Sequence, residues 1–143
     1  MLYSYSTDRF KTTDEYLERY PGDDIVDVLA FDLYDRGPDY VKAVKTCAEV
    51  VCEQAGQRNK LATMSETGGP IATITKWWTE TLLETLKPFD LSYVLVWRNP
   101  WKPAGHGAFA PYKNSPDSED FISFYKDPKT LFQKEVTKLK LYQ

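Results

Sequence analysis

Cysteine and histidine are scarce in this sequence. The 143 residues include two cysteines and one histidine. Two cysteines are too few for a disulfide framework, and one histidine excludes most metal sites and catalytic triads that depend on imidazole. Cys47 and Cys52 lie in an expected helix, about 140° from each other around its axis. We therefore predict two reduced, buried thiols with a structural role, and neither a metal nor a cofactor.

An excess of basic charge and long apolar segments are also missing. The chain has 18 Lys and Arg residues against 21 Asp and Glu residues, a net charge of −3. This balance offers no basic surface for nucleic acid or for an anionic membrane. No stretch approaches the roughly 18 apolar residues that span a bilayer. The N-terminal residues MLYSYSTDRF lack the basic and apolar regions of a signal peptide. The sequence thus predicts no nucleic-acid partner, no membrane contact and no signal peptide in this chain.

What the sequence does contain is an alternation of short β-rich segments with longer segments of helical spacing. The four expected strands are residues 2–6, 25–34, 61–65 and 92–97. The first expected helix has Thr13 or Asp14 as its N-cap, the second begins after Gly37-Pro38 with a C-cap at Gly56, and the third has Thr75 as its N-cap. Two more helical segments are expected over residues 118–126 and 128–139. Four successive β-then-α units predict a parallel sheet with helical crossovers.

Two architectures fit this pattern, a small doubly wound sheet and part of an eight-stranded barrel. A doubly wound nucleotide-binding sheet usually carries a glycine-rich turn after its first strand. The sequence contains neither G-x-G-x-x-G nor a P-loop. Polar and aromatic residues instead follow the ends of three strands: Asp32 and Tyr34, Ser65 and Glu66, and Trp97, Arg98 and Asn99. Catalytic groups gather at the carboxyl ends of barrel strands, so the barrel is favoured.

Glu66 is the first candidate for chemistry. It ends an apolar strand and precedes the loop Thr-Gly-Gly-Pro, so its carboxylate is expected to project into a cleft. As a glycosidase nucleophile, such a glutamate attacks the anomeric carbon while a second carboxyl protonates the leaving oxygen. The alternative is a glutamate at a strand end that pairs with an arginine or a lysine.

Four more residues at these strand ends are candidates for binding a sugar. Trp97 could offer its flat ring to the C–H face of a sugar, and Arg98 could bind hydroxyls or orient a carboxylate. The Tyr34 hydroxyl could donate a hydrogen bond to a nucleophilic carboxylate and hold it ionised. Asp32 lies on the same strand face as Tyr34 and could order the polar network or bind sugar hydroxyls. The alternatives are a core tryptophan with a surface arginine, and a half-buried strand tyrosine.

An aromatic-rich segment follows the last strand. It contains Trp101, His106, Phe109 and Tyr112. These side chains fit either the edge of a groove or a cover that shields the core from solvent.

A further signal comes from five segments taken together. They are YPGDDIVDVLAFDLY (residues 20–34), SETGG (65–69), KWWTETLLETLKP (76–88), SYVLVWRNPW (92–101) and DFISFYKDPKTLF (120–132). In order and spacing, over essentially the whole chain, they resemble glycoside hydrolase family 26, and most closely its β-mannanases (mannan endo-1,4-β-mannosidases). S-E-T-G alone would be a weak signal, but the combination is specific.

The resemblance implies a (β/α)8 TIM barrel. Residues 1–143 would supply its last four βα units, the C-terminal half of the glycoside hydrolase catalytic domain. The implied activity is retaining, double-displacement hydrolysis of β-1,4-linked mannan, glucomannan or galactomannan. By this resemblance Glu66 is the nucleophile at the end of the seventh strand, and Tyr34 donates a hydrogen bond to it. Trp97 and Arg98 match the pair after the eighth strand, where the tryptophan lies beneath the sugar beside the scissile bond. A secreted or cell-envelope location is also implied.

One departure from the family pattern is large. The acid/base glutamate of the family ends its fourth strand in a His-Glu context, and this sequence has no His-Glu pair. Retaining hydrolysis needs two carboxyl groups about 5–5.5 Å apart across the bond. A half-barrel would also leave two strand edges unpaired, so we expect self-association or a complementary N-terminal half-barrel. The alternative to hydrolysis is a half-barrel that binds β-mannan or another polysaccharide without turnover.

Overall fold

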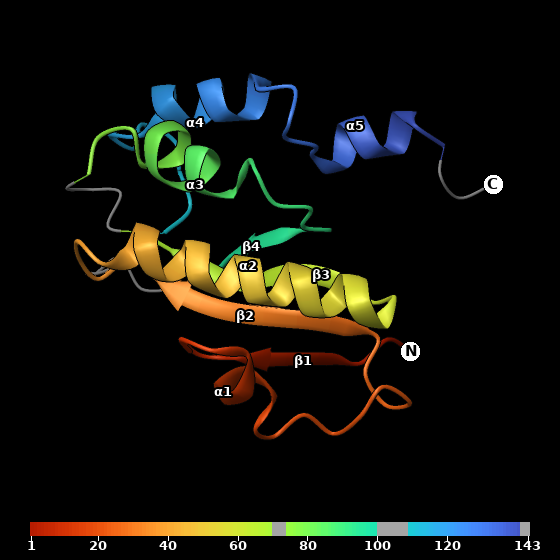
Figure 1. The fold of residues 1–143 in the computed structure, drawn as a ribbon. Helices are drawn as coiled ribbons and strands as arrows, with labels where there is room; N and C mark the ends of the chain where they lie inside the picture. Colours follow the sequence, from red (N-terminus) through yellow and green to blue (C-terminus); the bar gives the residue numbers. More distant parts are fainter. Residues whose placement is uncertain (70–73, 100–108, 141–143) are drawn as a thin grey trace.

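The described part of the chain is built on four parallel strands. The computed structural model describes residues 1–69, 74–99 and 109–140. Its sheet contains β1 (Ser4–Thr7), β2 (Val28–Tyr34), β3 (Leu61–Gly68) and β4 (Val94–Val96). The strands lie in the order of the sequence, and each neighbouring pair is parallel (Figure 1). The predicted run of parallel βα units is therefore confirmed.

Helical segments connect and follow these strands. They are α1 (Thr13–Leu17), α2 (Tyr40–Arg58), the π-helix η1 (Trp77–Leu83), α3 (Glu84–Leu86), α4 (Ser118–Lys126) and α5 (Gln133–Lys138). α2 lies along β2 and β3, and α4 lies beside η1 (Figure 1). Among the described residues, no helix combines the length and the apolar character needed to cross a bilayer.

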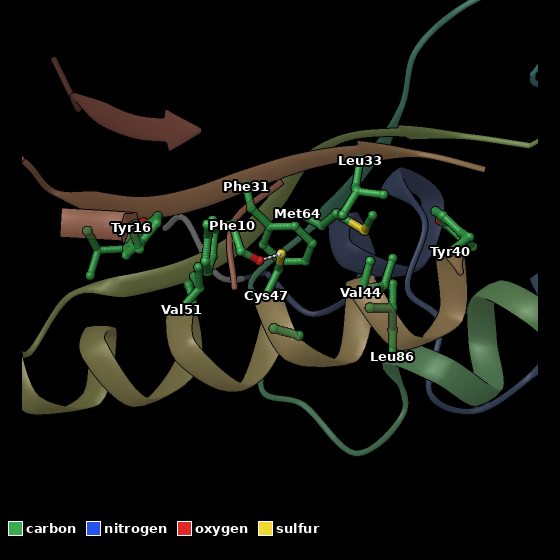
Figure 2. Packing of buried hydrophobic residues seen from close by; sticks show 14 of the residues in the cluster. Phe10, Tyr16, Phe31, Leu33, Tyr40, Val44, Cys47, Val51, Met64 and Leu86 are labelled. Atoms are coloured by element: carbon green, nitrogen blue, oxygen red, sulfur yellow. Dashed lines mark hydrogen bonds between the residues drawn. The ribbon is translucent and has the colours of Figure 1, made fainter. Parts of the chain in front are cut away.

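The core lies between the sheet and α2. Phe31 and Leu33 of β2 point toward this helix, where Val44 and Cys47 meet them (Figure 2). The Cys47 thiol also donates a hydrogen bond to the carbonyl oxygen of Phe10, with an S···O distance of 3.6 Å. Each fully buried apolar side chain of this size stabilises the fold by about 1.5–3 kcal/mol. The side chains on the face of the sheet toward α2 are thus buried in the core.

Two predicted helix ends are wrong. α1 is capped by Thr12 rather than by Thr13 or Asp14, because the Thr12 hydroxyl accepts a hydrogen bond from a backbone N–H of the first turn. α2 continues past Gly56 to a C-cap at Asn59, whose φ of 53° lies in the left-handed region. Asparagine is among the few residues that adopt this conformation at the end of a helix, so glycine is not needed there.

η1 begins without a cap of its own, so Thr75 as its predicted N-cap is wrong. The residue before the helix is Lys76, with a φ of 63° and no capping side chain. Asp120 of α4 takes this role, because its carboxylate accepts hydrogen bonds from the backbone nitrogens of Trp78 at 2.8 Å and Thr79 at 3.4 Å. A carboxylate at this position satisfies free N–H groups and interacts favourably with the helix dipole. The C-terminal part of the chain is thereby fastened to η1.

The remaining boundaries differ from the predictions by a few residues. β1 is shifted toward the C-terminus, and β2 and β4 are shorter than predicted. β3 continues past Ser65 to Gly68, so Glu66 lies within the strand rather than after it. α4 spans the predicted residues 118–126, whereas α5 begins at Gln133.

Both cysteines are free. Cys47 is buried as predicted, but Cys52 is only half-buried. Residues this far apart around a helix cannot both face the sheet, so the prediction of two buried thiols is wrong for Cys52. Of the aromatic-rich segment, Trp101 and His106 lie outside the described residues.

Candidate active site

A β-bulge in β3 sets the direction of the Glu66 side chain. β2 and β3 pair so that Phe31 lies opposite Met64 and Asp32 lies opposite Glu66. Ser65 is therefore an extra residue on β3, which makes this irregularity a bulge. Met64 is buried in the core, and strict alternation would turn Glu66 toward the core as well. The extra residue turns Glu66 to the opposite face of the sheet.

That opposite face, which we call the site face, carries Asp32, Tyr34 and Glu66. The Tyr34 hydroxyl donates a hydrogen bond to Oε2 of Glu66, with an O···O distance of 2.6 Å. Burial, and then the bond to Glu66, raise the pKa of Tyr34 well above its ordinary value. The phenol therefore keeps its proton and remains a donor to the carboxylate. The hydrogen bond expected from the resemblance is present.

Asp32 places a second carboxyl beside Glu66. The two residues are directly opposite each other in the β2–β3 register. Partial burial is the main cause that raises the pKa of Asp32, and the negative charges of Asp8 and Glu66 act in the same direction. A hydrogen bond with Ser6 opposes these effects. Asp32 is thus a half-buried carboxyl, next to Glu66, that binds a proton more readily than an exposed aspartate does.

Two serine hydroxyls hold the bulge. The Ser65 hydroxyl donates a hydrogen bond to the carbonyl oxygen of Phe31 at 3.1 Å, and its oxygen lies 2.5 Å from the hydroxyl oxygen of Ser6 on β1. Ser6 pairs with Ala30 of β2. Because the alanine side chain is a single methyl group, the two hydroxyls meet across β2.

The pairing of β3 with β4 brings Trp97 to the same edge of the sheet. The Trp97 backbone nitrogen donates a hydrogen bond to the carbonyl oxygen of Thr67 at 3.0 Å. Thr67 lies opposite Val96, so alternation puts Trp97 and Glu66 on the site face. Trp97 is 45% exposed, so it is not a core residue. The Arg98 guanidinium carbon lies 5.5 Å from the centre of the Trp97 ring system.

Some contacts of the site come from residues for which the sequence predicted no role there. The guanidinium carbon of Arg36 lies 6.0 Å from the centre of the Tyr34 ring, and the Phe109 ring centre lies 5.5 Å from it. Phe109 was distinguished only by its place in an aromatic-rich segment. Arg36 and Ser6 carried no local signal, because their roles depend on how distant segments pair.

The described residues hold no cluster of three or more His, Cys, Asp or Glu side chains that could bind a metal ion. What they bring together is a carboxylate with one fixed phenol donor, a neighbouring carboxyl and an exposed indole. A carboxylate in such surroundings is able to act as a nucleophile or to bind sugar hydroxyls.

Comparisons with known proteins identify the family of this chain. The family model for glycosyl hydrolase family 26 matches residues 1–99, which include all five candidate site residues. A mannan endo-1,4-beta-mannosidase of Bifidobacterium adolescentis is 30% identical over an alignment of 153 residues. That alignment covers 92% of this chain and 15% of the relative.

Solved structures extend the similarity to three dimensions. A GH26 β-mannanase from Bacteroides ovatus matches with a TM-score of 0.89 and 37% identity, covering 99% of this chain and 42% of that one. A modular endo-β-1,4-mannanase from Cellulomonas fimi matches with a TM-score of 0.79 and 27% identity, covering 94% of this chain and 32% of that one. This chain thus spans less than half the length of these relatives, and the predicted partial TIM barrel is confirmed. The chain belongs to glycosyl hydrolase family 26.

Proposed function

We propose that this chain is part of the catalytic domain of an endo-acting glycoside hydrolase that cleaves β-1,4-linked mannan, glucomannan or galactomannan. Membership of family 26 and the mannanase names of the relatives support this substrate class. Because the chain spans 15% to 42% of those relatives, the proposed activity is that of a complete barrel. Residues 1–143 would form its last four βα units.

In the proposed mechanism Glu66 is the nucleophile of a retaining hydrolysis. An oxygen of its carboxylate bonds to the anomeric carbon, the glycosidic C–O bond breaks, and a second carboxyl donates its proton to the leaving oxygen. Water then attacks the same carbon, the bond to Glu66 breaks, and the second carboxyl takes up the water proton. The observation that carries this assignment is the 2.6 Å hydrogen bond from Tyr34 to Glu66. That donor holds the carboxylate in one orientation.

The remaining candidates would bind the sugar. The exposed ring of Trp97 offers an apolar platform on the site face. Arg98, whose guanidinium lies against that ring, is proposed to bind sugar hydroxyls. Asp32, half-buried beside Glu66, is proposed to accept hydrogen bonds from hydroxyls of the same sugar.

The second carboxyl is proposed to come from a complementary N-terminal half-barrel. In the described sheet β1 and β4 are the edge strands, and a barrel closes only when both edges pair. Without that half, the chain is proposed to associate with itself through these edges. A secreted or cell-envelope location completes the proposal, since a polysaccharide substrate does not cross membranes.

The substitution Glu66→Gln tests the proposal in the full-length protein, by which we mean the proposed complete barrel with both of its halves. We expect the release of reducing ends from β-1,4-mannan to fall by at least about a thousandfold, because the amide cannot act as the nucleophile. Binding to a mannan oligosaccharide should persist. Glu80→Gln is the matched control, since Glu80 is exposed and pairs with Lys76 on η1, and its activity should equal that of the unmodified protein.

Three results would contradict the proposal. Unchanged turnover in Glu66→Gln would exclude the nucleophile role. A first-formed product of inverted anomeric configuration, observed by NMR, would exclude retention. Binding of mannan by the unmodified full-length protein without any hydrolysis would favour the alternative, a polysaccharide-binding domain.

A further inference from the structure

Phe109 packs against the ring that positions the hydrogen bond to Glu66. The centres of the Phe109 and Tyr34 rings lie 5.5 Å apart, with 50° between their planes. Tilted aromatic pairs at this distance are mutually stabilising. Arg36 lies near the same tyrosine, with its guanidinium carbon 6.0 Å from the ring centre. Tyr34 therefore has neighbours that restrict how far its ring can turn.

Gly68 provides the space that Phe109 occupies. Gly68 lies opposite Tyr34 in the β2–β3 register. A Cβ atom at Gly68 would lie 2.5 Å from Cγ of Phe109, closer than carbon atoms can approach. The φ angle of Gly68 is not in the left-handed region, so its backbone does not require glycine. Glycine is needed at this position because it leaves room for the Phe109 ring to pack against the end of β3.

Asn99 ties the chain beside Phe109 to the end of β4. Its side-chain nitrogen donates a hydrogen bond to the carbonyl oxygen of Ala110 at 2.8 Å. The backbone nitrogen of Ala110 donates one to the side-chain oxygen of Asn99, also at 2.8 Å. Two such bonds fix the backbone next to Phe109 as a strand partner would. The position of the Phe109 ring is thus determined from two sides, by the Asn99 pair and by Gly68.

From these contacts we infer that Phe109 is a positioning residue, which acts through Tyr34 to keep the phenol hydroxyl on Glu66. This inference rests on the proposed function, because it matters only if Glu66 is the reacting carboxylate. Removal of the Phe109 ring frees the Tyr34 ring to turn, and the hydrogen bond to Glu66 is then made for a smaller fraction of the time. The chemical step, rather than the binding of mannan, should become slower.

The test compares Phe109→Ala with Tyr34→Phe in the full-length protein. A hydrogen bond to a charged group is strong enough that its loss should lower kcat roughly tenfold or more, with KM changed less than about twofold. Asp32 and Arg36 are the other charged groups that act on Tyr34, and both variants leave them in place. The double variant should lose no more activity than Tyr34→Phe alone.

Two further variants make the test independent of folding defects. Phe109→Tyr keeps the ring and should restore the kcat of the unmodified protein. Gly68→Ala displaces the Phe109 ring without removing it and should reproduce the loss in kcat. Its matched control is Gly56→Ala on α2, where a Cβ atom meets nothing within 4 Å and where kcat should stay unchanged.

Two outcomes would overturn the inference. One is a rise in KM for Phe109→Ala with kcat unchanged, which would mean that Phe109 contacts the sugar itself. The other is additive loss in the double variant, which would mean that Phe109 acts independently of Tyr34. If Glu66→Gln is inactive while Phe109→Ala is normal, only this inference fails. If Glu66→Gln retains activity, the proposed function itself fails.

Discussion

The two faces of the sheet differ in what covers them and in what their side chains do. On the face toward α2, Phe31 and Leu33 are buried in the core. On the site face, Asp32 and Tyr34 are only partly buried and lie beside Glu66. These four residues alternate along β2, so a single strand supplies packing on one side and chemistry on the other. Substitutions on the two faces should therefore separate stability from activity.

Two tryptophans give this comparison its largest expected effects. Trp78 of η1 belongs to the same buried cluster as Phe31 and Leu33 and is 2% exposed. Its ring nitrogen donates a hydrogen bond to Asp117 at 2.6 Å. Trp78→Ala should lower the free energy of unfolding by about 3–5 kcal/mol, because it leaves a cavity in the core. Trp97→Ala should change that free energy by less than about 1 kcal/mol, because the ring is largely exposed. It should instead weaken mannan binding by about 1.5–3 kcal/mol, the value of one buried aromatic contact.

Chemical denaturation and KM measurements on the full-length protein check the two tryptophans together. If Trp97→Ala destabilises the fold as much as Trp78→Ala, the two faces do not divide their roles as described. An unchanged KM in Trp97→Ala would remove the tryptophan from the proposed sugar platform.

A smaller effect concerns Asp32 and pH. The folded state raises the pKa of Asp32 above its unfolded value, so it binds this proton more tightly than the unfolded chain does. The stabilising contribution of this carboxyl is therefore present at acidic pH and is lost as the pH rises through the folded pKa. Asp32→Asn should be as stable as the unmodified protein, or slightly more so, at about pH 7, and the difference should vanish near pH 4. Its activity on mannan should nevertheless fall.

Melting temperatures at the two pH values check the sign of this effect. Asp24→Asn is a suitable control, because Asp24 is exposed on the turn before β2. A loss of stability at neutral pH in Asp32→Asn, with none in the control, would mean that the Asp32 charge stabilises the fold.

The order of the elements was predictable because it depends on short-range patterns. Apolar spacing located α4 over residues 118–126 and indicated four parallel strands. The features that were missed depend on distant partners. Asp120 caps η1 from 42 residues away along the chain, and no pattern near Thr75 could reveal that.

The same distinction applies to the candidate site. Asp32 and Tyr34 share a face because strand residues alternate, and the resemblance indicated the bond from Tyr34 to Glu66. The direction of Glu66 depends on the bulge at Ser65, which forms only when β3 pairs with β2. The contact of Phe109 with Tyr34 depends on where the segment after β4 returns to the sheet. Such features follow from tertiary pairing, and residue type alone does not report them.

Covalent labelling tests the central assignment most directly. The full-length protein would be treated with a 2-deoxy-2-fluoro-manno-oligosaccharide that carries a good leaving group, then digested and examined by mass spectrometry. If Glu66 is the nucleophile, a single glycosyl adduct should appear on the peptide that contains Glu66, and Glu66→Gln should remain unlabelled. An adduct on any other carboxylate, or turnover of this reagent with no adduct at Glu66, would contradict the account.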